Sequence, residues 1–166
     1  INWTHNGNGS LSGASTLTPT YNAVSSDAGN TVTLTMTVTS NNACNPQTAT
    51  ATYTVSVDPQ PTASAGGSET ICSNGAATVS GASASNGTIM WTHDGNGSLS
   101  NASTLTPTYN SVASDEGNTV TLTMTVTSNN ACFPETATAT YTVTIGSGTT
   151  APTFVTSDEN NFCEDD

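Results

Sequence analysis

The stretch TVTLTMTVTSNNAC occupies residues 31–44 and returns, letter for letter, at residues 119–132. In both copies apolar residues alternate strictly with threonine, which is the period of a strand with one buried face. Threonine is β-branched and favours pleated backbone, so a helix is excluded over these residues. Each copy therefore predicts a long strand with apolar side chains turned inward and threonines turned outward.

The duplicated stretch lies inside a longer repeat. Placing Trp3 on Trp91 gives an offset of 88 that holds without a gap over residues 3–57, and 46 of these 55 positions are identical. Identity of this degree indicates recent tandem duplication of one structural unit. The nine pairs that differ are Asn6/Asp94, Gly13/Asn101, Ala23/Ser111, Ser25/Ala113, Ala28/Glu116, Asn45/Phe133, Gln47/Glu135, Ser56/Thr144 and Val57/Ile145.

A second correspondence marks where a unit begins. PTASAGGSETIC at residues 61–72 has the same length from proline to cysteine as PTFVTSDENNFC at residues 152–163. One complete unit therefore runs from about residue 61 to residue 145. The expected organisation is the rear part of one unit at 1–57, a linker at 58–60, the complete unit at 61–145, a linker at 146–151 and the start of a third unit at 152–166.

The complete unit has the pattern of a β-sandwich. ATATYTVTI at residues 137–145 also alternates, and the turn-forming residues NNACFPE join it to the strand at 119–128 as a hairpin. GTIMWTH at residues 87–93 and several shorter segments bring the total to six or seven strands, with no helical window. This pattern predicts an all-β fold of tandem immunoglobulin-like β-sandwich repeats. The aromatic residues expected in the cores are Trp3, Trp91, Tyr21, Tyr109, Tyr53 and Tyr141.

The charge balance excludes several functions. The chain has twelve acidic residues, two histidines and neither lysine nor arginine, for a net charge of −12. Nucleic-acid binding and polybasic membrane contact both depend on cationic side chains, so neither partner is expected. No apolar run approaches the roughly 20 residues that cross a bilayer. Such a surface attracts divalent cations rather than anions.

The four cysteines, Cys44, Cys72, Cys132 and Cys163, are disulfide candidates in an oxidising, extracellular setting. A Cys72–Cys132 bridge within the complete unit is the simplest pairing. An immunoglobulin-like topology argues against it, because it puts these cysteines at opposite poles, about 33 Å apart along a ten-residue strand, whereas a disulfide allows about 6 Å. The alternative is a staple between neighbouring units, and both pairings stay open.

Metal ligands are sparse in the sequence. His5 and His93 each follow a tryptophan by two residues, which indicates a core strand rather than a metal site. Asp94, Asn96 and Ser98 alternate as in a calcium loop, but the first copy has Asn6 in place of Asp94, so a tight turn is expected. Carboxylates cluster in the tail, which is expected to be a solvated acidic segment. The alternative is that the tail binds a divalent ion such as calcium. The candidate ligands are Asp158, Glu159, Glu164, Asp165 and Asp166.

The order of these motifs also has a parallel among known repeats. PTASAGG…ETIC, then Trp91, LTPTY, Asp115 and the long strand closing on NNAC resemble the PKD-like or Ig-like tandem repeats of giant bacterial cell-surface adhesins. The SprB-type gliding-motility adhesins, exported by the type 9 secretion system, are the members to compare. The resemblance implies an extracellular filament or stalk on a bacterial surface, without enzymatic activity or cofactor, whose partners are neighbouring repeats and other filament subunits.

The expected function is thus structural: a stalk segment that extends a binding tip from the cell. The alternative is an adhesive module whose repeats themselves bind calcium or glycan. No histidine has a nucleophile and a carboxylate placed beside it by the sequence pattern, so no catalytic residue is expected.

Overall fold

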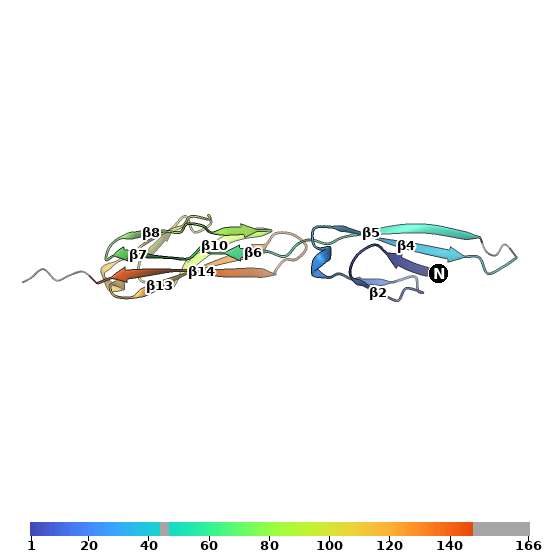
Figure 1. The fold of residues 1–166 in the computed structure, drawn as a ribbon, viewed down its shortest axis with the longest axis horizontal. Coiled ribbons are helices and arrows are strands. Elements are labelled where there is room, and N and C mark those ends of the chain that lie inside the picture. The colour runs from blue at the N-terminus through green and yellow to red at the C-terminus, as the bar shows by residue number, and fades with distance from the viewer. Residues whose placement is uncertain (44–46, 148–166) are drawn as a thin grey trace, which may run out of the picture.

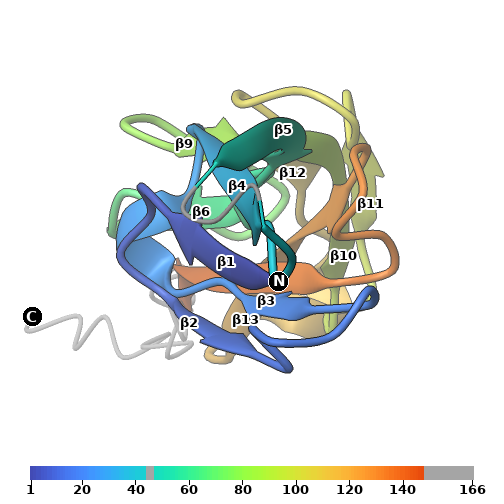
Figure 2. The same ribbon diagram turned by 90° about the vertical axis from the view of Figure 1, so that its right-hand side faces the viewer.

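The computed structural model describes residues 1–43 and 47–147, which form two β-rich units placed end to end along one axis (Figure 1). Viewed down that axis, one unit lies behind the other (Figure 2). The first unit contains β1 (Asn2–His5), β2 (Ser10–Ser12), β3 (Thr20–Asn22), the 3-10 turn η1 (Ser25–Asp27), β4 (Thr31–Thr39) and β5 (Thr48–Ser56). The second contains β6 (Thr62–Ser64), β7 (Ser68–Cys72), β8 (Ala76–Thr78), β9 (Ser83–Ser85), β10 (Gly87–His93), β11 (Ser98–Ser100), β12 (Thr108–Asn110), the 3-10 turn η2 (Ala113–Asp115), β13 (Thr119–Ser128) and β14 (Thr136–Gly146).

The second unit is a sandwich of two main sheets. One has the strand order β10-β13-β14-β7 and the other the order β11-β12-β8, while β6 and β9 form a small extra pair. Side chains from both main sheets meet in one core, in which Tyr109 from β12 and Leu122 from β13 are fully buried. The prediction of an all-β sandwich fold is confirmed.

The threonine alternation sets the register of the long hairpin. β13 pairs antiparallel with β14 so that Leu122 faces Tyr141 and Thr123 faces Thr140 across the two strands. Apolar side chains thus pair with apolar ones on the inner face, and threonines pair with threonines on the outer face. On its other side β13 pairs with β10, which sets Trp91 opposite Met124.

β7 is the one strand of this sheet that runs parallel to its neighbour. Its register with β14 extends from Ser68 opposite Thr142 to Cys72 opposite Gly146. The chain therefore enters the unit at the end nearest the first unit and leaves it at the far end, beside the end of β7 (Figure 1).

The first unit repeats part of this arrangement. Its sheet has the order β1-β4-β5, and Leu34 faces Tyr53 as Leu122 faces Tyr141. It has no counterparts of β6 to β9 among the described residues, so that β5 is an edge strand. Its core is correspondingly open: Trp3 and Tyr21 are half-buried, and Tyr53 is 63% exposed. The prediction that Tyr53 is a core residue is therefore wrong here, whereas Trp91, Tyr109 and Tyr141 are buried as predicted.

The predicted number of strands was too low. Six or seven were expected in the complete unit, and the structure has nine between residues 62 and 146. The additional strands have three residues each, too few to show a period in the sequence. Within the described part of the chain, no helix has the length and apolar character required to cross a bilayer.

Candidate functional site: the joint between the units

The two units meet where the loop between β13 and β14 lies against the linker at residues 58–60. The side-chain amide of Asn130 donates to the carbonyl oxygen of Pro59 at 2.9 Å, and the backbone N–H of Ala131 donates to Oδ2 of Asp58 at 3.0 Å. Asn86, which precedes β10, donates its side-chain amide to the carbonyl oxygen of Gln60 at 2.9 Å. All three linker residues are thus hydrogen-bonded to the second unit.

Hydrogen bonds within the loop between β13 and β14 hold the Asn130 side chain in the orientation of this contact. Oδ1 of Asn130 accepts hydrogen bonds from the Ser128 hydroxyl at 2.6 Å and from the backbone N–H of Cys132 at 2.9 Å. These bonds fix the Asn130 side chain so that its amide nitrogen points at the linker. Ser40 and Asn42 make the equivalent hydroxyl-to-amide bond at 2.6 Å in the first unit, so the loop carries this local geometry in both copies.

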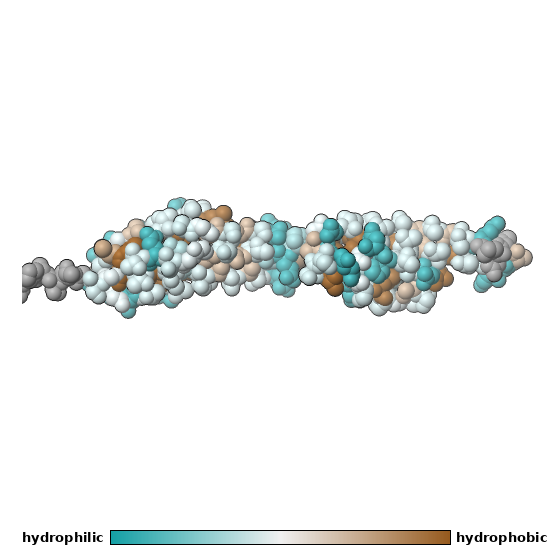
Figure 3. Space-filling model, viewed as in Figure 1, coloured by the Kyte–Doolittle hydropathy of each residue, from teal (hydrophilic) through white to brown (hydrophobic). Residues whose placement is uncertain are grey.

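A shallow hollow of about 510 Å³ lies at the joint. It is lined by residues of η1 and its flanks from the first unit, by the linker, and by Asn86 and Cys132 from the second. Teal, hydrophilic residues gather around the joint in Figure 3. The contact between the units is therefore polar and directional rather than a shared hydrophobic core.

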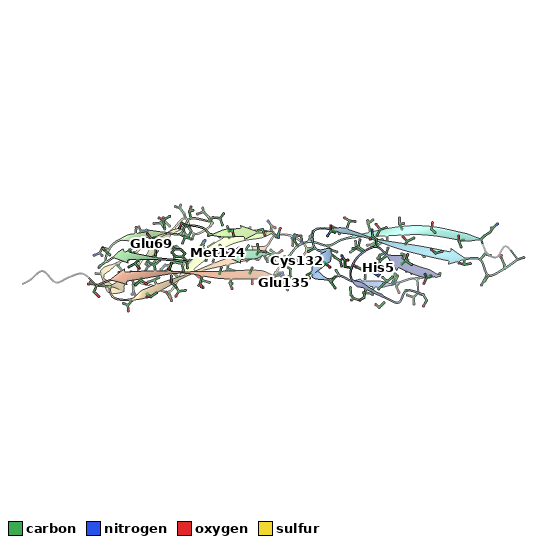
Figure 4. All side chains as sticks on the ribbon, in the orientation of Figure 1. His5, Glu69, Met124, Cys132 and Glu135 are labelled. Atoms are coloured by element: carbon green, nitrogen blue, oxygen red, sulfur yellow. The ribbon has the colours of Figure 1, made fainter. Side chains whose placement is uncertain are left out.

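The structure separates the two cysteines of the complete unit. Cys132 lies at the joint (Figure 4), with Sγ 3.5 Å from the carbonyl oxygen of Asp58 and 3.7 Å from that of Pro59. Cys72 is exposed at the other end of the unit, opposite Gly146. From Thr136 to Gly146 the β14 strand spans about 33 Å, so a Cys72–Cys132 bridge is incompatible with this fold. Both thiols are free, and Cys44 and Cys163 lie outside the described residues.

A buried carboxylate recurs in each unit. In the second unit the Tyr109 hydroxyl donates to Oδ2 of Asp115 at 2.7 Å and itself accepts the backbone N–H of Gly97 at 2.9 Å. Asp115 also accepts the backbone N–H groups of Asn96, at 2.8 Å, and of Val112, at 3.2 Å. The first unit has the same set, in which Tyr21 donates to Asp27 at 2.7 Å.

These hydrogen bonds shift the pKa of both partners. Burial raises the pKa of Asp115, but donors from Asn96, Tyr109 and Val112 outweigh it and lower the pKa to about 2. For Asp27, the backbone N–H of Asn8 and the Tyr21 hydroxyl are the main causes of a pKa lowered to about 2. Burial and the bond to Asp115 raise the pKa of Tyr109 to about 12. The tyrosine is therefore neutral and the aspartate ionised near neutral pH, and neither group exchanges a proton readily there. The pair has a structural role.

At residues 94–98, where a turn was expected instead of a calcium loop, the side chain of Asp94 accepts a backbone hydrogen bond. Oδ1 of Asp94 accepts the backbone N–H of Thr121 at 2.7 Å, and Oδ1 of Asn6 accepts that of Thr33 at 2.8 Å. An amide and a carboxylate oxygen serve equally as this acceptor, which explains why the two residues interchange between the copies.

The histidines and the other carboxylates form no metal centre in the described part of the chain. His5 and His93 pack against Tyr21 and Tyr109, with ring centroids 5.1 Å apart in both pairs. No group of three or more histidine, cysteine, aspartate or glutamate side chains is close enough to hold an ion among residues 1–43 and 47–147. The acidic candidates Asp158, Glu159, Glu164, Asp165 and Asp166 lie outside these ranges.

Sequence reasoning missed the residues that make the joint. Asp58 and Asn130 were predicted only as linker and turn residues, because the bonds from Ala131 to Asp58 and from Asn130 to Pro59 leave no local pattern in the sequence. A comparison with known protein families finds no matching family model, and no curated protein matches the sequence.

Proposed function

We propose that this chain is a load-bearing stalk segment of a very large secreted adhesin, which holds a binding tip away from a bacterial cell. The resemblance of the motif order to adhesin repeats supports this function. The structural support is mechanical, and it comes from how the chain enters and leaves the complete unit.

The observation that carries the proposal is the parallel pairing of β7 with β14. Tension on the chain pulls residue 61 toward the first unit and residue 146 the opposite way, along the direction of both strands. The hydrogen bonds of the ladder lie across that direction, so the force shears them together instead of opening them one at a time. The five register pairs from Ser68–Thr142 to Cys72–Gly146 therefore act as one clamp.

The joint and the composition fit the same function. A linker of three residues, each hydrogen-bonded to the next unit, transmits tension without slack. The absence of lysine and arginine leaves trypsin-like proteases no cleavage site, which suits a stalk exposed to the surroundings. A net charge of −12 keeps neighbouring stalks apart.

Single-molecule pulling of the full chain, held by its two ends, tests the proposal. The N–H of Thr142 donates to the carbonyl oxygen of Gly67 at 3.3 Å, so the alternation of a parallel ladder turns the N–H of Glu69 toward β14 and that of Thr70 away from it. Glu69→Pro should therefore lower the unfolding force of the complete unit sharply, whereas the matched control Thr70→Pro should lower it much less. Equal unfolding forces for the two variants would show that this clamp does not carry the load.

A further inference from the structure

The first unit has an open apolar face. Residues that are buried in the second unit are exposed at the equivalent positions of the first unit. Tyr53 is 63% exposed where Tyr141 is 3% exposed, and Val38 is 37% exposed where Val126 is 0% exposed. The two strands that carry Val38 and Val126 have the same sequence, so the difference lies in what covers them.

A groove of about 420 Å³ runs along this face, and its lining includes Trp3, Leu17, Tyr21, Leu34, Tyr53 and Val55. In the second unit the corresponding space is filled by the segment that contains β6 to β9. That segment contributes small apolar side chains to the core, namely Ala63, Ala65, Ile71, Ala77, Val79, Ala82 and Ala84. The complete unit thus shows what kind of chain the groove accepts.

We propose that this groove binds a β-strand segment with the pattern of residues 61–72, supplied by the same polypeptide ahead of Ile1, and that the cysteine ending this segment forms a disulfide with Cys132 of the following unit. The inference rests on the repeat and the groove, and it stands independently of the stalk function.

The register of the bound strand follows from the offset of 88. β7 pairs parallel with Thr142 to Gly146, whose counterparts are residues 54–58, so the incoming strand lies parallel along the free edge of β5. The two units match closely at this end: Val57 donates to the carbonyl oxygen of Asn30 at 3.0 Å, as Ile145 does to that of Asn118 at 2.9 Å. The cysteine of the strand, opposite Gly146 in the complete unit, then comes opposite Asp58.

Cys132 is already at that place. Its Sγ lies 3.5 Å from the carbonyl oxygen of Asp58. The incoming cysteine would lie one strand spacing, about 4.8 Å, from Asp58, so both thiols come next to the same residue. A disulfide between them requires a Cα separation of roughly 4.4–6.8 Å. Two thiols then become one disulfide, and the two electrons and two protons pass to a disulfide oxidant that is reduced to two thiols. Each bond joins one unit to the next, which accounts for the exposed Cys72 at the far end of the second unit.

The test uses the full reduced chain and a synthetic peptide with the sequence of residues 61–75, its cysteine carried as a 2-thiopyridyl disulfide. Attack by the Cys132 thiolate forms the new disulfide and releases pyridine-2-thione, whose absorbance gives the rate. Chymotryptic mapping, required because trypsin has no site, identifies the cysteine that reacted. We expect modification of Cys132 at least about tenfold faster than of the other cysteines, and than with a scrambled peptide, because docking raises the local concentration.

Two variants separate docking from simple thiol reactivity. Tyr53→Asp alters an exposed groove residue and should abolish the preference for Cys132, whereas Thr52→Asp, on the outward face, should preserve it. Equal rates with the scrambled peptide, or an unchanged preference in Tyr53→Asp, would overturn the inference. Sedimentation as a dimer without peptide, with a Cys132–Cys163 cross-link, would assign the groove to the tail of a second copy and overturn the occupant proposed here.

Discussion

At the scale of single residues, the most constrained groups are Asp27 and Asp115, each 1% exposed in a chain without lysine or arginine. A buried carboxylate normally has a cationic partner. Here only N–H and O–H donors stabilise it, and the tyrosine hydroxyl supplies one of them in each unit. The tyrosine and the aspartate are therefore one structural element, which ties the start of the long strand to the turn after β10.

Replacing Tyr109 by phenylalanine tests this pairing. Tyr109→Phe removes the donor to Asp115 and the acceptor for Gly97 while keeping the ring. We expect a loss of about 1–3 kcal/mol in the free energy of unfolding of the second unit, measured by denaturant titration. Tyr53→Phe, at an exposed position, is the control and should change stability by less than about 0.5 kcal/mol. Equal losses of stability for the two substitutions would show that the Tyr109–Asp115 hydrogen bond does not stabilise the second unit.

The same groups predict the pH dependence of stability. The pKa of Asp27 and Asp115 is lowered from 3.8 to about 2, so the unfolded chain binds more protons than the folded chain between these values. Stability present above about pH 4 should fall as the pH drops toward 2. The raised pKa of Tyr109 gives the opposite limb, with stability lost as the pH rises from 10 toward 12.

Thermal melting across the pH range checks both limbs. Asp115→Asn should flatten the acid limb of the second unit, because that position no longer titrates. A wild-type melting midpoint that is equal at pH 4 and pH 2 would contradict the assigned carboxylates.

At the scale of elements, the duplicated strand shows that identical sequence does not fix burial. β13 is buried at every second residue, and all its apolar side chains are shielded. In β4 the same letters leave Met36 half-buried and Val38 exposed. The cause is the segment of residues 61–88, which covers the second unit and has no counterpart over the first unit among the described residues.

One substitution made in each copy measures this difference. Val126→Thr places a hydroxyl in a closed core and should cost about 1–3 kcal/mol, whereas Val38→Thr, at a 37% exposed site, should cost less than about 0.5 kcal/mol. Hydrogen exchange followed by mass spectrometry reports each unit separately. A comparable loss of protection in both units would mean that the first unit is covered in solution.

Sequence alone located the elements with a clear period. The strands expected at 87–93 and 119–128 match β10 and β13, since five or more alternating positions define a face. The three-residue strands β9 and β11 gave no such signal. Pro107, which has no N–H to donate to a strand ladder, directly precedes β12. The bonds of Asn130 to Pro59 and of Ala131 to Asp58 at the joint could not be predicted, because they join residues 71 and 73 positions apart through tertiary packing.

At the scale of the molecule, the two units form a rod because the joint fixes their relative direction. Asn130 and the N–H of Ala131 bond the linker on the side facing the second unit, and Asn86 bonds it again at Gln60. A three-residue linker held at each residue leaves little freedom for bending. Repetition of this joint along an array of units would give a long, straight stalk.

Small-angle X-ray scattering of the full chain in solution tests whether the joint holds the two units on one axis. The wild type should scatter as one extended rod with both units on a common axis, and the double variant Asp58→Ala with Asn130→Ala should broaden into an ensemble of bent forms. A wild-type profile that requires units at varied angles, or a double variant that scatters identically to the wild type, would contradict this role of the joint.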